Sequence, residues 1–303
     1  MPTPRSDDAP ALDVGPIRTL VDLPCETGEG PLWHPDERAL FWLDIPPGRV
    51  YRYDPVTGEN ALVYEHDGPV GGMTIQEDGG FLLFGAAGRI VQWLAGEIKT
   101  VVDEIPAERE TRFNDVIADP AGRVYCGTMP KPDGMAALYR LDTNGSIHLA
   151  YDDIAQSNGM GFTADERSMF LTDTRFRAIY RMDYDKATGE LGNRRAIIRT
   201  PQDNGAPDGM AVDADDTIWS ARWGGHGLFR YALDGELLGQ VRFPVSNVSS
   251  IAFGGDDYAT AFVTTATGGA KRGPEVGELA GSLFAVDLGA RGKPPFRSRI
   301  RVP

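Results

Sequence analysis

Cysteine and long apolar stretches are scarce in this chain. Among 303 residues only Cys25 and Cys126 are cysteines, which is too few for a disulfide scaffold, and their spacing matches no zinc motif. We therefore expect two buried or half-buried thiols. Nowhere do about 18 apolar residues follow one another, so no membrane-spanning helix is expected.

Positive charge is also in short supply. The chain has 30 Lys and Arg against 44 Asp and Glu, a formal net charge of −14. Nucleic acids and anionic membrane surfaces repel such a protein at long range. We expect neither as a partner, and nothing in the sequence implies a protein partner. A cation or a small neutral substrate suits an acidic field better.

The first residues, MPTPRSDDAPALDVG, lack the basic start and the apolar run of a signal peptide. We interpret residues 1–15 as a disordered tail on a cytoplasmic protein. Residues 16–303 are then expected to form one domain.

An internal repeat dominates the rest of the chain. Six segments align with one another at spacings of 41 to 50 residues. They are EGPLWHPD from Glu29, GGMTIQED from Gly71, NDVIADPAG from Asn114, NGMGFTAD from Asn158, DGMAVDAD from Asp208 and SSIAFGGD from Ser249.

Each segment is followed by a turn rich in Asp and Gly and then by further β-branched or aromatic runs, which predicts four strands per unit. The sixth unit lacks a fourth strand, and PIRTLVDLP from Pro16 has the missing pattern. The sequence therefore predicts an all-β, six-bladed β-propeller in which the N-terminal strand closes the last blade. The alternative, a β-sandwich with regular hairpins, does not account for a permuted closing strand.

The six aligned starts of the inner strands should meet at one mouth of the central channel. They are Glu29, Gly71, Asn114, Asn158, Asp208 and Ser249. Crowded carboxylates need a cation or a shared proton. Because these donors are all oxygen atoms, one divalent ion is expected, with Ca²⁺ first, Mg²⁺ or Mn²⁺ next, and Zn²⁺ or Fe²⁺ also compatible. Taken singly, Asn158-Gly159 and Asp208-Gly209 are also ordinary turn pairs.

Four spaced motifs resemble a known family. GEGPLWHPDERALFWLDI, RFNDVIADPAGRVYCGTM, SNGMGFTADERSMFLTDT and PDGMAVDADDTIWSARWGG are similar to the signature stretches of the senescence-marker-protein, gluconolactonase and luciferin-regenerating-enzyme family. The resemblance implies a six-bladed propeller whose metal is held by Glu29, Asn158 and Asp208. It also implies that Arg112 and Asn114 bind substrate oxygens, with Asn114 near or on the metal.

One stretch departs from that family. Mammalian members carry acidic residues soon after the GTM motif that help to hold the sugar, whereas residues 130–133 here are Pro, Lys, Pro and Asp. The sugar preference of those members is therefore not carried over to this chain.

The reaction expected from these residues is hydrolysis of a small neutral sugar lactone. Asp208 is the expected general base, with activation of water by the ion as the alternative. Arg112 would hydrogen-bond the lactone, or else pair with Glu110 or Asp115. Ester or phosphotriester hydrolysis, calcium binding without catalysis and a protein-binding scaffold are the competing functions. Trp223, Arg222 and His226 either wall the pocket or pack their loop.

Overall fold

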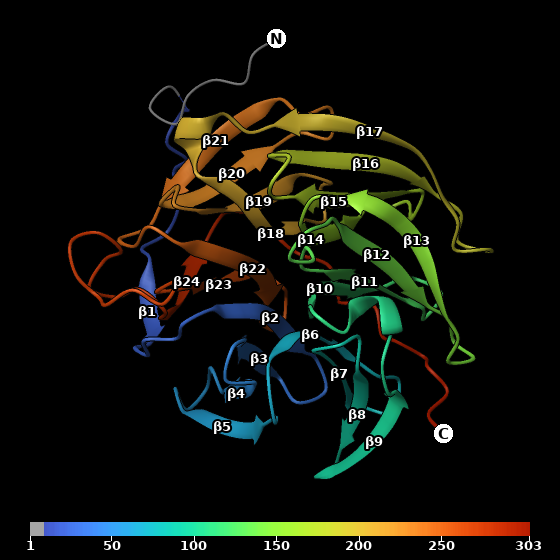
Figure 1. The fold of residues 1–303 in the computed structure, drawn as a ribbon. Helices are drawn as coiled ribbons and strands as arrows, with labels where there is room; N and C mark the ends of the chain where they lie inside the picture. The colour runs from blue at the N-terminus through green and yellow to red at the C-terminus, as the bar shows by residue number, and fades with distance from the viewer. Residues whose placement is uncertain (1–8) are drawn as a thin grey trace.

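Six four-stranded antiparallel sheets stand in a ring around a central axis in the computed structural model, which describes residues 9–303 (Figure 1). This arrangement confirms the six-bladed β-propeller. In the described part of the chain, two short 3₁₀ helices, η2 (Pro106–Glu108) and η3 (Gln202–Asn204), are the only helical turns. No helix within residues 9–303 is long and apolar enough to cross a membrane.

The strands occupy equivalent places in each blade. The inner strands are β2 (Gly28–His34), β6 (Val70–Ile75), β10 (Phe113–Ala118), β14 (Ser157–Phe162), β18 (Ala206–Val212) and β22 (Val248–Gly254). The second strands are β3 (Ala39–Asp44), β7 (Phe81–Gly85), β11 (Val124–Thr128), β15 (Ser168–Asp173), β19 (Ile218–Trp223) and β23 (Thr260–Thr265). The third strands are β4 (Arg49–Tyr53), β8 (Ile90–Leu94), β12 (Ala136–Leu141), β16 (Ala178–Tyr184), β20 (Gly227–Tyr231) and β24 (Leu283–Asp287). The outer strands are β5 (Asn60–Glu65), β9 (Glu97–Val102), β13 (Ile147–Ile154), β17 (Leu191–Arg199), β21 (Leu237–Arg242) and β1 (Arg18–Val21).

The last blade is closed by the N-terminal strand. β1 pairs antiparallel with β24, with Arg18 opposite Ala285 and Thr19 opposite Phe284, and Figure 1 shows blue β1 beside red β24. This confirms the predicted closure. The last blade gains its fourth strand from the N-terminal segment, which links it to the first blade and covers the edge of β24.

Part of the predicted tail contacts the propeller. Residues 1–8 lie outside the described part of the chain. Ala11 forms a parallel bridge with Gln240 of β21, and the Gly15 amide donates to the Asp287 carbonyl at 2.8 Å. The described chain thus begins with a segment that runs along blade five towards β24.

Hairpin turns between third and outer strands repeat one local solution. In blade one the Asp54 carboxylate accepts the Val56 and Thr57 amides, and Gly58 adopts a left-handed φ of 74°. Blade four repeats it with Asp185 and Gly189, whose φ is 72°. An Asp that caps the turn and a glycine that tolerates positive φ explain why these residues recur between strands.

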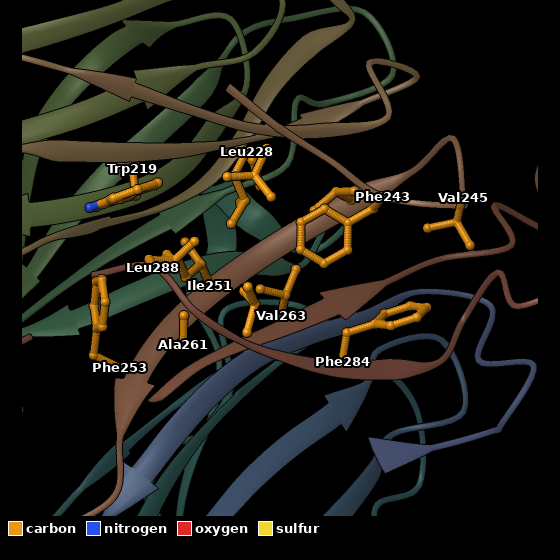
Figure 2. Close-up of a cluster of buried hydrophobic side chains, with 14 of the residues drawn as sticks. Trp219, Leu228, Phe243, Val245, Ile251, Phe253, Ala261, Val263, Phe284 and Leu288 are labelled. Carbon is orange, nitrogen blue, oxygen red and sulfur yellow. The ribbon is translucent and has the colours of Figure 1, made fainter. Parts of the chain in front are cut away.

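The core lies between neighbouring blades. Figure 2 shows the cluster between blades five and six, where Leu228 and Phe243 of one blade face Val263 and Phe284 of the next. Phe243 and Phe284 pack edge to face with ring centroids 5.8 Å apart. Truncating either ring to alanine would cost about 3–5 kcal/mol. This packing holds the blades, and so the inner strands, at fixed positions around the axis.

The C-terminal segment closes one end of the channel. Ile300 is buried, and its amide and carbonyl both bond the side-chain amide of Gln76, at 3.0 and 2.8 Å. On the side of the ring opposite Gln76, the Ala214 amide donates to the Arg291 carbonyl at 2.7 Å. The segment therefore lies across the end of the channel opposite to the one where the inner strands begin.

Candidate metal and substrate site

All six inner strands carry a β-bulge at the position where they enter the channel. The register with the second strand shifts between Glu29/Leu32, Val70/Gly72, Phe113/Val116, Ser157/Met160, Pro207/Met210 and Val248/Ser250. A bulge bends the strand and redirects its side chains. The residues expected at the mouth therefore leave the normal in-and-out alternation of a strand.

Small residues after the mouth positions let the inner strands approach one another. A Cβ on Gly159 would lie 2.3 Å from the Met210 nitrogen, and one on Gly209 would lie 2.1 Å from Ser250 Oγ. Such distances are too short for any side chain. Close packing at the axis therefore requires the glycines of the Asn-Gly and Asp-Gly pairs.

Asn158 and Asp208 are brought into direct contact. The Asn158 side-chain nitrogen donates to Asp208 Oδ1 and, at 3.1 Å, to Thr174 Oγ1. Both side chains are almost fully buried, at 3% and 6% exposure. The amide oxygen of Asn158 is left with the Gly159 amide at 3.2 Å as its hydrogen-bond partner, which frees it to act as a ligand.

Glu29 completes the expected ligand set from the neighbouring side of the ring. Its Oε2 accepts the Gly30 amide at 2.7 Å, and the side chain is 4% exposed. Burial, followed by the nearby Asp115 and Asp208 carboxylates, raises the pKa of Glu29 well above its ordinary value. Burial and Asp115 likewise raise the pKa of Asp208. Ionising both carboxylates without a cation nearby would cost free energy, because they are buried and repel each other.

Asp115 is a third carboxylate at this site, which the sequence interpretation did not assign. It lines the channel, and burial raises its pKa to about 7, while Arg112 acts in the opposite direction. Aligned residues in the other blades are Gly30, Gly72, Gly159, Gly209 and Ser250. Asp115 is the one acidic residue at an aligned position that is otherwise glycine or serine, and this exception was the signal in the sequence that could have identified it as a site residue.

Arg112 and Asn114 form one unit. Arg112 Nη1 donates to the Asn114 Oδ1 and to the Phe113 carbonyl, both at 2.8 Å, and Asn114 Nδ2 donates to the Ser157 carbonyl of the next blade at 2.9 Å. Burial lowers the pKa of Arg112, and the surrounding carboxylates oppose this. The remaining guanidinium donors face a site rich in carboxylates and could bind substrate oxygens.

Two ring positions contribute no ligand. Gly71 has no side chain, and a Cβ there would meet the Phe113 carbonyl at 2.0 Å. Ser249 is fully buried, and its hydroxyl hydrogen-bonds the Gly28 carbonyl of blade one. Both positions serve the contact between blades.

The three residues whose role was left open lie in different surroundings. Arg222 is fully buried and packs within blade five, with its guanidinium over the Phe229 ring at 5.0 Å and bonded to the Tyr231 hydroxyl at 2.8 Å, and its charge opposes the rise in the pKa of Asp208 that burial causes. Trp223 is half-buried against Gly268. His226 is exposed, with a φ of 57°.

A cavity of about 220 Å³ continues from the ring down the channel. Backbone and side chains of all six inner strands line it, among them Met160, Met210 and Asp115, and residues 293–296 form its floor. Asp115 lines this cavity, whereas the candidate ligands Glu29, Asn158 and Asp208 do not, so the cavity lies in the channel between the candidate site and the C-terminal segment.

The donor set fits a hard divalent ion. Within residues 9–303, no group of three His, Cys, Asp or Glu side chains could hold a metal by itself, so a cation would need the Asn158 oxygen beside Glu29 and Asp208. Carboxylate and amide oxygens are what Ca²⁺ and Mg²⁺ prefer. The buried acids, with their raised pKa values, gain most from such an ion.

The six-bladed propeller fold and the buried oxygen donors on its axis together indicate the class of protein to which this chain belongs. The family described as "SMP-30/Gluconolactonase/LRE-like region" matches residues 27–267. The chain belongs to this family, as its motifs predicted.

Relatives and solved structures agree with this assignment. The chain is similar to the pentonolactonase XacC of Haloferax volcanii, with 45% identity over 94% of this chain and 99% of that protein. It is also similar to the regucalcin of Danio rerio, with 34% identity over 89% of this chain and 94% of that protein. A solved regucalcin from Agrobacterium tumefaciens, described as a calcium-binding protein, has the same fold, with a TM-score of 0.86 at 23% identity over 97% of this chain and 99% of that one.

Proposed function

We propose that this protein hydrolyses a small neutral sugar lactone to the aldonic acid with the help of one divalent cation, Ca²⁺ being the first to test. The proposed ligands are Glu29, Asn158 and Asp208. The observation that supports this most directly is the burial of two carboxylates and an amide oxygen at the mouth of the channel. The similarity to a pentonolactonase supports the lactone as substrate.

The chain's own residues account for binding and orientation. When bound, the cation would polarise the lactone carbonyl and lower the pKa of a nearby water. Arg112 is held by Phe113 and Asn114, so its remaining donors can bind the hydroxyl or ring oxygens of the sugar. Asp208 can take the proton of the attacking water. The Asn158 bond orients the Asp208 carboxylate for that step.

Acid release from lactones of five- and six-carbon sugars tests the proposal. The rate above spontaneous hydrolysis would be measured before chelation, after chelation and after return of Ca²⁺, Mg²⁺, Mn²⁺ or Zn²⁺. We expect a rate that disappears with chelator, returns with metal and falls at least about 10²-fold in Glu29→Gln and Asp208→Asn. Glu37→Gln, an exposed acid far from the mouth, is the matched control and should keep the full rate.

A cation-binding protein without catalysis is the second candidate, because the same buried acids would favour it and relatives are named regucalcin. Tight Ca²⁺ binding with no lactone hydrolysed above background would favour that function. Turnover of esters or phosphotriesters instead of lactones would assign a different substrate to the same site.

A further inference from the structure

The Thr174 hydroxyl joins the two blades that carry the Asn158 and Asp208 side chains. It accepts a hydrogen bond from Asn158 Nδ2 at 3.1 Å and donates one to the Pro207 carbonyl at 2.8 Å. Pro207 directly precedes Asp208. One hydroxyl thus contacts one candidate ligand and the backbone that leads into another.

Thr174 is itself rigidly held. Its amide donates to the Gln156 carbonyl at 3.0 Å. The buried carboxylate of Asp173 accepts the amides of Ala155 at 2.8 Å, Gln156 at 3.1 Å and Phe176 at 3.1 Å. The loop entering β14 and the turn after β15 are therefore fixed to each other, and the hydroxyl has a defined place at the mouth.

The hydrogen bonds decide which way the Asn158 amide faces. A hydroxyl has one proton, and that of Thr174 goes to Pro207, so Thr174 presents a lone pair to Asn158. Asp208 Oδ1 is also an acceptor. With both acceptors on one side, the NH₂ group must lie there and the amide oxygen must point away from them. When Asp208 binds a cation, Thr174 remains as the neutral acceptor that keeps this orientation.

The repeat indicates that packing alone does not require a hydroxyl here. Each residue that precedes a mouth position pairs with a second-strand residue: Gly28 with Asp44, Val70 with Gly85, Phe113 with Thr128, Ser157 with Asp173, Pro207 with Arg222 and Val248 with Thr265. The residues that follow these partners are Ile45, Ala86, Met129, Thr174, Trp223 and Ala266. Five of the six are apolar, so Thr174 is the exception in a blade that carries a candidate ligand.

We propose that Thr174 is a positioning residue that turns the Asn158 amide oxygen towards the bound cation and fixes the chain before Asp208. The inference rests on the proposed metal site. Groups that orient metal ligands in this way commonly change metal affinity about 10- to 100-fold when they are removed.

Calcium affinity of the full chain is the first test, measured by competition with a calibrated chelating dye. We expect Thr174→Val to weaken Ca²⁺ binding about 10- to 100-fold and Thr174→Ser to restore it to within about threefold. Thr163→Val is the matched control, because that hydroxyl bonds the Ser168 amide at the opposite end of the same blade, and it should leave the affinity unchanged. Thr174→Ala replaces the valine variant if the latter does not fold.

Lactone turnover then separates positioning from a structural role. The kcat of Thr174→Val should fall at low Ca²⁺ and recover when Ca²⁺ is raised above its new dissociation constant, with the KM for lactone little changed. Wild-type protein that binds no divalent ion would overturn both the metal site and this inference. Wild-type protein that binds Ca²⁺ while Thr174→Val binds it equally well would overturn the role of Thr174 alone.

Discussion

Replacing Asp115 with Asn tests whether the ionised form of this third carboxylate lowers the free energy of unfolding of the metal-free protein. Burial raises the pKa of Asp115 from 3.8 to about 7. Between these pH values the folded protein holds a proton that the unfolded chain has released. The free energy of unfolding should therefore fall as pH rises through this window and level off above about pH 7.

The size of the effect follows from the same window. At 1.36 kcal/mol per pH unit, a pKa of about 7 against 3.8 corresponds to roughly 4 kcal/mol. For a chain of 303 residues this is roughly 6 °C in Tm. Asp115→Asn removes the charge and keeps the shape. The part of the window between pH 5 and about pH 7 spans about two units, so we expect its stability relative to wild type to be higher at pH 8 than at pH 5 by roughly 3 kcal/mol.

Thermal unfolding followed by circular dichroism, with chelator at both pH values, measures this difference. Glu29 and Asp208 also have raised pKa values, to which the Asp115 charge contributes, so the comparison measures the Asp115 carboxylate together with its effect on these two groups. With Ca²⁺ present the order should reverse, because the ion favours the ionised carboxylate. A stability difference between variant and wild type that is the same at pH 5 and pH 8 would refute the reasoning.

Two further substitutions test the substrate contact and the packing of the ring. Arg112→Met removes the bonds to Asn114 and Phe113 and should lower kcat/KM for lactone about 10²-fold, at about 1.5–3 kcal/mol for a charged hydrogen bond. Ca²⁺ affinity should not fall, because a positive charge beside Glu29 and Asp208 is removed; unaltered kcat/KM would contradict a substrate role. Gly209→Ala places a Cβ 2.1 Å from Ser250 Oγ and 2.8 Å from the Ser249 carbonyl. It should lower the free energy of unfolding, measured in urea, by about 1–3 kcal/mol. The control Gly192→Ala has nothing within 4 Å of the added Cβ and should lower it far less.

The fold could be predicted from the sequence because each blade uses the same chemistry at the same register. Turn residues such as Asp54 and Gly58 recur with their counterparts Asp185 and Gly189, and the apolar runs between them have strand lengths. The path of residues 9–15 could not be predicted in this way. They combine backbone hydrogen bonds to Gln240 and Asp287 with packing of Leu12 and Val14 on the core between blades five and six, and so short a segment has no repeat to align with.

The candidate ligands Glu29, Asn158 and Asp208 could be named because they fall at one register position of the repeat. Thr174 and Asp115 also had a signal, as exceptions at positions where the other blades carry apolar or small residues. An exception, however, does not say what it contacts. The role that we propose for Thr174 depends on blade five, which places the Pro207 carbonyl 2.8 Å from its hydroxyl.

Asp115 shows most clearly why a strand pattern alone misassigns such a site. In a regular strand consecutive side chains point to opposite faces, so a ligand role for Asn114 would direct Asp115 away from the axis. The bulge between Phe113 and Val116 breaks that alternation, and Asp115 lines the channel and raises the pKa of both Glu29 and Asp208. The same bulge occurs in all six inner strands, but five of the six following residues are glycine or serine. Asp115 is therefore the one acidic side chain among the six residues that follow the mouth positions, and it adds negative charge to the channel while the other five positions stay small.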